Sequence, residues 1–128
     1  MKKSVLVFIS LIFLVSCSNK TQLTGDLTGQ WYIYKITRNS IDEGSLVNDS
    51  FKNYSITFTS AGQYVEQNVT NLVDTSFQTG TWQFQNSYGQ LVLTDTARKQ
   101  RVYTVFNLVG NHVELLRNAE DRYMRKFQ

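Results

Sequence analysis

The stretch Gly29-Gln30-Trp31-Tyr32-Ile33-Tyr34-Lys35-Ile36-Thr37-Arg38 decides the fold. Aromatic and β-branched residues fill it, which is the composition of a β-strand. A Gly-x-Trp pattern opens it, and the same pattern returns at Gly80-Thr81-Trp82. Glycine allows a tight backbone turn, and tryptophan supplies a large apolar body for a core. If Trp31 points into that core, strict alternation places Ile33 and Lys35 on the same face.

Seven further runs of the chain have the composition or the period-two alternation of β-strands. Parallel strands would need crossover segments that this chain lacks, so we expect an antiparallel meander. Eight up-and-down strands can close into a barrel, which leaves no free edges. The predicted fold is therefore all-β, an eight-stranded antiparallel barrel. Its predicted strands are residues 29–38, 54–58, 63–73, 77–85, 90–95, 101–109, 112–117 and 122–127.

Polar segments separate these strands. The longest, Asn39 to Asn53, predicts a long loop with a short helical turn. A loop of this length is often a lid or a binding loop, and an ordinary surface excursion is the alternative. Residues 74–76 predict a turn. The densest basic run, Arg98-Lys99-Gln100-Arg101, is interpreted as a solvated turn, with a binding patch as the alternative. No basic cluster is long enough to predict a nucleic-acid partner.

The first 16 residues have the features of a secretory signal peptide. Lys2 and Lys3 precede an apolar run from Val5 to Val15, and 11 residues are too few for a transmembrane helix. Leu14-Val15-Ser16-Cys17 resembles the lipobox of bacterial lipoproteins. This resemblance implies cleavage before Cys17 and acylation of its thiol, which would anchor the protein to a membrane. The alternative is an ordinary signal peptide with an incidental cysteine.

Ser18 occupies the position that helps to sort bacterial lipoproteins between membranes, and a residue other than Asp there resembles an outer-membrane address. We therefore expect a lipid-anchored protein of the bacterial cell envelope. The domain organisation is a signal peptide at 1–16, a lipidated Cys17 and flexible tether at 17–27, and a barrel at 28–128. Without Lys2 and Lys3 the mature chain has 11 basic and 10 acidic residues, so its net charge is only +1.

Several features together resemble the lipocalins, and more closely the short lipocalin-like domains of bacterial lipoproteins. These are Gly29-Gln30-Trp31 at the first strand, a long first loop, the meander, the second Gly-x-Trp and the Tyr-rich hairpin from Tyr103 to Leu116. The likeness covers about residues 25–128, although the Thr-Asp-Tyr-type motif and the C-terminal helix of larger lipocalins are missing. It implies that Trp31 plugs the closed end of the barrel and that Arg122 or Arg125 packs over it as a cation–π pair.

No catalytic constellation is present in the sequence. His112 is the only histidine and is interpreted as an exposed strand-end residue, with nothing resembling a nucleophile elbow nearby. Most carboxylates fall in predicted turns, and only Glu66 and Glu114 fall within strands. Cys17 is the only cysteine, which excludes an intrachain disulfide and a cysteine-based metal site. We expect a non-enzymatic protein without a cofactor or metal.

The aromatic residues are the best functional candidates. An eight-stranded barrel is just wide enough to be filled by side chains or to hold one small ligand. The first hypothesis, in line with the lipocalin resemblance, is a lipid-anchored barrel that binds a small hydrophobic ligand. The alternative is a packed barrel that docks on an envelope protein or inhibits an enzyme. The candidate ligand-binding interior is Trp31, Ile33, Ile56, Phe58, Trp82, Phe84, Leu93 and Phe106.

Overall fold

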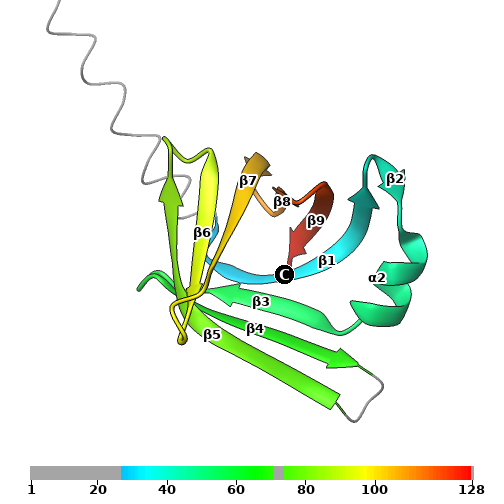
Figure 1. Cartoon of the computed structure of the whole chain (residues 1–128), viewed down its shortest axis with the longest axis horizontal. Helices are drawn as coiled ribbons and strands as arrows, with labels where there is room; N and C mark the ends of the chain where they lie inside the picture. Colours follow the sequence, from blue (N-terminus) through cyan, green and yellow to red (C-terminus); the bar gives the residue numbers. More distant parts are fainter. Residues whose placement is uncertain (1–26, 71–73, 128) are drawn as a thin grey trace, which may run out of the picture.

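The computed structural model describes residues 27–70 and 74–127, whose path is drawn in Figure 1. Among these residues, no helix has the length and apolar character required to span a membrane. The elements are β1 (Gly29–Arg38), β2 (Ile41–Asp42), α2 (Gly44–Ser50), β3 (Tyr54–Phe58), β4 (Gln63–Thr70), β5 (Asp74–Gln85), β6 (Gln90–Asp95), β7 (Gln100–Val109), β8 (His112–Arg117) and β9 (Glu120–Lys126).

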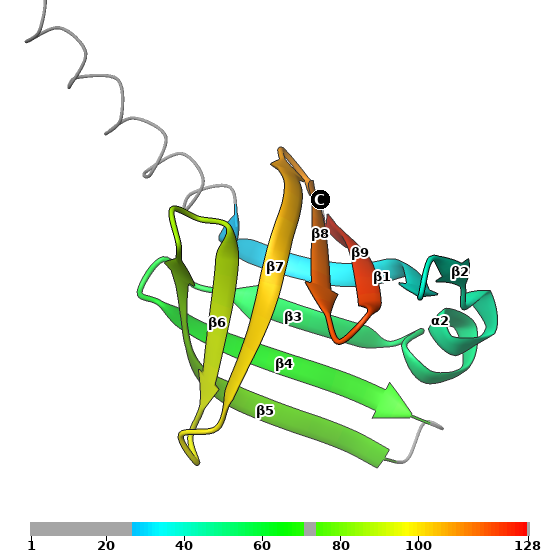
Figure 2. The ribbon, with the colours of Figure 1, turned by 45° about the horizontal axis from the view of Figure 1, so that its top comes forward.

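The long strands form one closed antiparallel sheet. Each strand from β3 to β8 pairs with the next strand along the chain, and β1 pairs with both β3 and β9, so the sheet closes into a barrel. The two-residue strand β2 only extends the end of β1, at Thr37 and Arg38. In Figure 2, β6 and β7 cross in front of β3 and β4 at a steep angle, as opposite walls of the barrel. The prediction of an eight-stranded antiparallel barrel is therefore confirmed.

Most predicted boundaries lie close to the observed ones, with one clear exception. The turn predicted at residues 74–76 is wrong, because β5 already begins at Asp74. Thr75 and Ser76 pair with Val69 and Asn68 of β4, so both residues belong to the sheet. Residues 71–73, predicted as strand, lie outside the described residues. The long loop predicted after β1 contains β2 and the seven-residue helix α2, in agreement with the expected short helical segment.

Strand β1 anchors the core, but its alternation is interrupted. Trp31 and Ile36 are fully buried, and Ile33 is 4% exposed. The pairing with β9 shifts register between Ile33 and Lys35. A β-bulge of this kind inserts one residue and changes which side chains face inward. The prediction that Lys35 shares the inward face of Trp31 is therefore wrong. The Lys35 ammonium lies 5.1 Å from the centroid of the Tyr123 ring instead.

Large apolar side chains fill the end of the barrel that holds the two tryptophans, the closed end. Trp31 Nε1 donates to the carbonyl oxygen of Leu27 at 2.7 Å, and Trp82 Nε1 donates to that of Thr59 at 3.1 Å. Both indole N–H groups are thus satisfied. Phe58 packs edge-to-face on Trp82, with ring centroids 5.7 Å apart. The aromatic residues therefore use the internal space at this end for their own packing.

Candidate functional site

The inward side chains change from apolar to polar along the barrel. On β4, the buried Tyr64 is followed two positions later by Glu66, which lines a cavity. On β9, Met124 lies in the core, whereas Arg122, two positions earlier, lines the same cavity. Alternate residues of a strand share a face. The barrel interior is therefore apolar at the closed end and polar at the opposite end, the mouth, where β1 ends and β3 begins.

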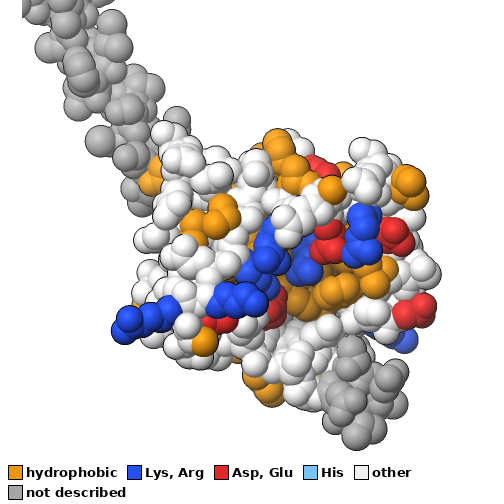
Figure 3. Space-filling model, in the orientation of Figure 1, with side chains coloured by type: hydrophobic (Ala, Val, Ile, Leu, Met, Phe, Trp, Pro, Cys, Tyr) orange, Lys and Arg blue, Asp and Glu red, His pale blue; other side chains and the backbone are white. Residues whose placement is uncertain are grey.

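A cavity of about 380 Å³, the mouth cavity, occupies this polar end. Its volume lies in the range of small-molecule sites. Figure 3 shows Lys and Arg side chains crossing this face of the molecule, beside carboxylates and a patch of apolar side chains. The aromatic part of the lining comes from Phe51, Tyr54 and Phe77. The charged part comes from Glu66, Arg101 and Arg122.

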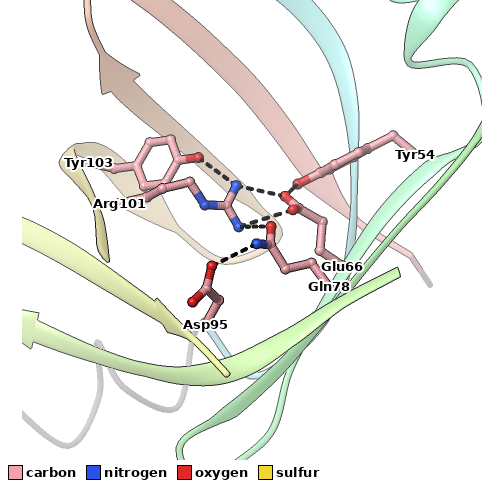
Figure 4. Close-up of polar contacts among 6 residues, drawn as sticks. All are labelled: Tyr54, Glu66, Gln78, Asp95, Arg101 and Tyr103. Atoms are coloured by element: carbon pink, nitrogen blue, oxygen red, sulfur yellow. Dashed lines mark hydrogen bonds and ion pairs between the residues drawn. The ribbon is translucent and has the colours of Figure 1, made fainter. Parts of the chain in front are cut away.

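Glu66 and Arg101 form an ion pair across the barrel interior (Figure 4). Arg101 Nη1 donates to Glu66 Oε2 at 3.2 Å, and Nη2 donates to Oε1 at 3.0 Å. The Arg101 and Glu66 side chains are only 17% and 13% exposed. Strands β5 and β6 separate β4 from β7 in the sheet. The pair therefore braces two strands that share no backbone hydrogen bonds and closes the floor of the mouth cavity.

Three neighbouring side chains complete the hydrogen bonding of this pair. Tyr54 Oη donates to Glu66 Oε2 at 2.6 Å. Arg101 also donates to Tyr103 Oη at 3.2 Å and to Gln78 Oε1 at 3.1 Å. The network draws on strands β3, β4, β5 and β7, as Figure 4 shows. Buried polar groups need such partners, because an unsatisfied one costs on the order of 1–3 kcal/mol.

Burial and the ion pair fix the protonation states in the network. Burial disfavours the charged form of Arg101, but the hydrogen bond and the charge of Glu66 outweigh it, so the pKa of Arg101 is raised. Burial also raises the pKa of Tyr54 well above its ordinary value, and the Glu66 carboxylate adds to that effect. Tyr54 is thus a neutral donor and Arg101 a cation at neutral pH. Gln78 Nε2 in turn donates a hydrogen bond to Asp95 Oδ2, at 3.1 Å, which extends the network to Asp95.

A second group of charges lies beside the first. Glu120 Oε1 accepts from Arg122 Nε at 2.7 Å, and Glu120 Oε2 accepts from Arg38 Nη2 at 2.8 Å. Burial would raise the pKa of Glu120, but the hydrogen bonds from the two arginines outweigh burial and lower it. These three residues, with Tyr103 and Arg117, line a space of about 280 Å³, the side cavity.

Arg122 is the residue that the two cavities share. Its side chain is 18% exposed. Its guanidinium carbon lies 5.2 Å from the centroid of the Phe51 ring and 6.0 Å from that of Tyr54. Both distances allow a cation–π attraction, which holds the guanidinium against the aromatic wall.

The lining of the two cavities carries a surplus of positive charge. Among the described residues, four arginines and two glutamates line them, and the formal charges of these six side chains sum to +2. A cleft with walls of low dielectric focuses such a field and attracts ions of opposite sign. The arginines are Arg38, Arg101, Arg117 and Arg122, and the glutamates are Glu66 and Glu120.

The residues predicted to line a ligand pocket lie elsewhere in the barrel. Phe84 is partly buried and packs against the core. None of the predicted residues lines the mouth cavity or the side cavity. All of them except Phe106 contribute to the packed core instead. The predicted residues that are buried in that core are Trp31, Ile33, Ile56, Phe58, Trp82 and Leu93.

Phe106 was predicted to be an interior residue, and this placement is wrong. Its side chain is 43% exposed. The pairing of β7 with β8 shifts register between Phe106 and Val109. Alternation before the shift turns Tyr103 and Val105 toward the core, and after it Leu108 is buried. Phe106 therefore lies on the outer face of the barrel.

The predicted packing of Arg122 or Arg125 over Trp31 is also corrected. The cation above the Trp31 ring is Lys126, whose Nζ lies 5.0 Å from the ring centroid. Lys126 is the cross-strand neighbour of Trp31 in the pairing of β1 with β9. Arg122 lies at the mouth instead, and the Arg125 guanidinium carbon lies 4.4 Å from the centroid of the Tyr34 ring. Register, rather than residue type, decides which cation meets the tryptophan.

Arg101 is the main functional residue that the sequence pattern did not identify. The sequence predicts Arg101 at the end of a solvated basic turn and at the start of the strand 101–109. The structure confirms its place in a strand, β7, but turns its side chain into the barrel. The signal that could have found it is its spacing of two from Tyr103, which is 3% exposed. His112, expected to be exposed, is partly buried, with Nδ1 3.2 Å from Tyr34 Oη. Cys17 lies outside the described residues.

Known structures share this architecture. The crystal structure of a lipocalin-like protein from Bacteroides uniformis matches with a TM-score of 0.66 and 14% identity, over 80% of this chain and 100% of that one. An uncharacterized protein from Bacteroides eggerthii matches with a TM-score of 0.59 and 10% identity, over 79% and 99%. At these identities the likeness shows the fold alone. No curated protein matches the chain.

The comparison with protein families agrees with the fold. The model of the lipocalin-like domain matches residues 27–115, which is well over half of the chain. That range begins just before β1 and reaches into β8, so it includes Trp31, Trp82 and both partners of the Glu66–Arg101 pair. The chain belongs to the lipocalin-like domain family.

Proposed function

We propose that this protein is a lipid-anchored, non-enzymatic binding protein of the bacterial cell envelope, most simply of the outer membrane, which holds a small ligand in the mouth cavity. The observation that carries the proposal is the contrast between the two ends of the barrel. One end is filled with packed aromatic and aliphatic side chains. The other holds a cavity of about 380 Å³ with both aromatic and charged walls.

The position of the cavity refines the expected ligand. A purely hydrophobic ligand was predicted to occupy the aromatic interior, but those side chains fill that space themselves. The ligand would instead rest on Phe51, Tyr54 and Phe77 with its apolar part. Asn68 also lines the cavity, and its buried Oδ1 accepts no hydrogen bond from any described residue. A ligand with a polar group as well as an apolar body would use both kinds of wall.

The anchor rests on the leader sequence. Lys2 and Lys3, the short apolar run and the lipobox-like Leu14-Val15-Ser16-Cys17 follow one another in the order expected of a bacterial lipoprotein. Metabolic labelling with an alkyne-bearing palmitate tests this part. The wild-type chain should take up the label and a Cys17→Ser variant should not. Equal labelling of both chains would exclude Cys17 as the acylated residue.

Native mass spectrometry tests the ligand. The mature chain with Cys17→Ser, secreted into a bacterial periplasm, should carry a bound mass of a few hundred daltons that is lost on denaturation. The matched control is a Ser76→Trp variant, which places a bulky side chain on the wall of the mouth cavity. It should fold and carry no ligand. The same bound mass on both chains would place the ligand elsewhere, and an apo mass for both would favour the alternative of a protein-docking module.

A further inference from the structure

The arginine that joins the two cavities has hydrogen-bonding capacity that the described protein does not use. Within the described residues, the only hydrogen bond of Arg122 runs from Nε to Glu120. A guanidinium group has five N–H donors. Nη1 and Nη2 of Arg122 therefore have no acceptor among these residues, although the side chain is 18% exposed and lines both cavities.

The nearby carboxylates are already occupied. Glu66 accepts two hydrogen bonds from Arg101 and one from Tyr54. Glu120 is divided between Arg38 and Arg122. Another arginine of the side cavity, Arg117, takes part in none of the ion pairs of the described residues. Its guanidinium carbon lies 5.9 Å from the centroid of the Tyr103 ring.

The aromatic wall limits the kind of anion that fits. Phe51 and Tyr54 lie beside the Arg122 guanidinium, and Phe77 lines the same cavity while its side chain is largely exposed. A bare inorganic anion would contact the guanidinium groups and leave these rings in water. A molecule with one anionic group and an apolar body would cover the rings and complete the hydrogen bonding of the arginine at once.

We propose that the ligand of the mouth is an amphipathic anion, whose charged group is held by Arg122 and Arg117 and whose apolar body lies against Phe51, Tyr54 and Phe77. This inference rests on the proposed ligand-binding function and names its ligand class. Carboxylate, sulfonate and phosphate monoester groups share the required chemistry, which is a compact set of acceptor oxygens with negative charge. A cation would meet the surplus of positive charge and is disfavoured.

A pair of fluorescent probes separates charge from shape. 1-Anilinonaphthalene-8-sulfonate is an amphipathic anion, and N-phenyl-1-naphthylamine has the same aromatic body without the sulfonate. The experiment uses the mature chain with Cys17→Ser. This chain keeps all strand pairings of the barrel, which lie between Gly29 and Lys126. It also carries no acyl chain that could compete with the probe. The anionic probe should bind at least about tenfold more tightly than the neutral one.

The variants identify the arginines. Arg122→Gln should weaken binding of the anionic probe about tenfold or more and leave the neutral probe unchanged. Arg117→Gln keeps the test usable if the first variant does not fold, and should weaken the anionic probe several-fold. The matched control is Arg125→Gln, which removes the same charge from the same strand but faces away from both cavities. It should bind both probes as the parent chain does.

The outcomes distinguish this inference from the function on which it rests. Equal binding of the two probes overturns the inference and leaves a site that does not select for charge. Binding of the anionic probe that neither Arg122→Gln nor Arg117→Gln weakens overturns it as well, and leaves a ligand site elsewhere. If neither probe binds, both proposals fail. Displacement of the anionic probe by decanoate and by decyl phosphate, each compared with acetate and inorganic phosphate, separates the head groups. Displacement by inorganic phosphate alone, as strong as that by decyl phosphate, would overturn the amphipathic class.

Discussion

The ion pair of Glu66 and Arg101 shows how charged residues at inward positions change the interior of a barrel. Each residue stands where an apolar side chain would have extended the core. A buried ion pair is weak evidence for stability, because desolvation offsets much of the attraction between the charges. What the pair does supply is a defined boundary. Its hydrogen bonds to Tyr54, Tyr103 and Gln78 hold the floor of the mouth cavity in one arrangement.

This ion pair leads to a prediction that compares the removal of one charged partner with the neutralisation of both. Arg101→Gln should lower the free energy of unfolding by about 3 kcal/mol, because it leaves the Glu66 carboxylate buried without its cation. The double variant Glu66→Gln/Arg101→Gln should recover more than half of that loss, since two amides leave no buried charge. Urea titration at pH 7 measures both. Arg98→Gln, on an exposed turn, is the control. A double variant no more stable than Arg101→Gln would contradict this account.

Tyr54 carries a prediction about pH. Burial raises its pKa, and the neutral phenol donates to Glu66. A raised pKa in the folded state adds stability below the ordinary value of about 10, and this stability is lost as the pH rises beyond it, because the unfolded chain ionises first. Wild-type stability should therefore fall between pH 9.5 and 11. Tyr54→Phe should cost about 1–2 kcal/mol at pH 7 but decline less over that interval.

The control for this prediction removes a hydroxyl group that is not in the network. Tyr88 lies at the turn between β5 and β6 and is partly exposed. Tyr88→Phe should keep both the stability at pH 7 and the alkaline decline of the parent chain. Urea titrations at pH 7 and pH 10.5 compare the three chains. A Tyr54→Phe variant that loses stability as steeply as the wild type would assign the alkaline decline to another group.

At this scale the sequence predicted the core better than the site. Alternation divides β7 into two faces, but both carry large apolar residues: Val102 and Phe106 on one, Tyr103 and Val105 on the other. Nothing local shows which face is inside. The pairing of Tyr103 with the fully buried Leu91 on β6 settles it. Arg101 was missed because its orientation depends on that long-range register.

Register shifts in two strands, β1 and β7, change which of their side chains face the core. The register shift in β1 buries Ile36 instead of Lys35, and the shift in β7 buries Leu108 although Phe106, two residues earlier, is exposed. Asn107 has a φ of 50°, in the left-handed region where asparagine is favoured. A bulge adds one residue without changing composition, so period-two patterns cannot place it. Both errors in the predicted faces come from these positions.

The contact between β5 and β6 yields a prediction at the element scale. A Cβ atom added to Gly80 would clash with the carbonyl oxygen of Thr94, which is part of the backbone of β6. The two strands would have to move apart, so Gly80→Ala should destabilise the barrel by about 3 kcal/mol. Gly44→Ala is the matched control. Its nearest neighbour would be Asp42 Oδ1 at 3.7 Å, and helix propensity favours alanine.

Thermal and urea unfolding of the two glycine variants decides this point. Gly44→Ala should unfold at or slightly above the midpoint of the wild type, and Gly80→Ala well below it. The second Gly-x-Trp pattern would then have a physical reason, since the glycine permits the close approach of β6 while Trp82 packs inside. Equal midpoints for the two variants would show that the sheet adjusts at Gly80 with little strain.

The closed barrel itself was accessible from the sequence, because its signals are local. Turn residues and short alternating runs predict a meander, and a meander of eight strands closes by pairing its first and last members. The division of the barrel interior was not accessible in this way. Glu66, Arg101 and Arg122 come from three strands, and only their registers bring them to one end. Function in this molecule therefore depends on information that single strands do not hold.

The division of the barrel into an apolar closed end and a polar mouth predicts that stability and ligand binding can be changed separately. Trp31 is fully buried at the closed end and lines neither cavity. Trp31→Ala should lower the free energy of unfolding by about 3–5 kcal/mol, because it removes a large core side chain and leaves a hole. Phe51, by contrast, is partly buried and lines the mouth cavity. Phe51→Ala should cost much less stability.

Binding of 1-anilinonaphthalene-8-sulfonate should follow the opposite order. Under conditions in which urea unfolding shows both variants to be folded, Phe51→Ala should weaken binding several-fold, because the ring covers the apolar body of the probe and holds Arg122 in place. Trp31→Ala should bind within about twofold of the parent chain, since the hole that it creates is apolar and disfavours an anion. Fluorescence titration beside urea unfolding measures both quantities on the same samples. If Trp31→Ala abolished binding while the chain stayed folded, the two ends of the barrel would have to act as one site.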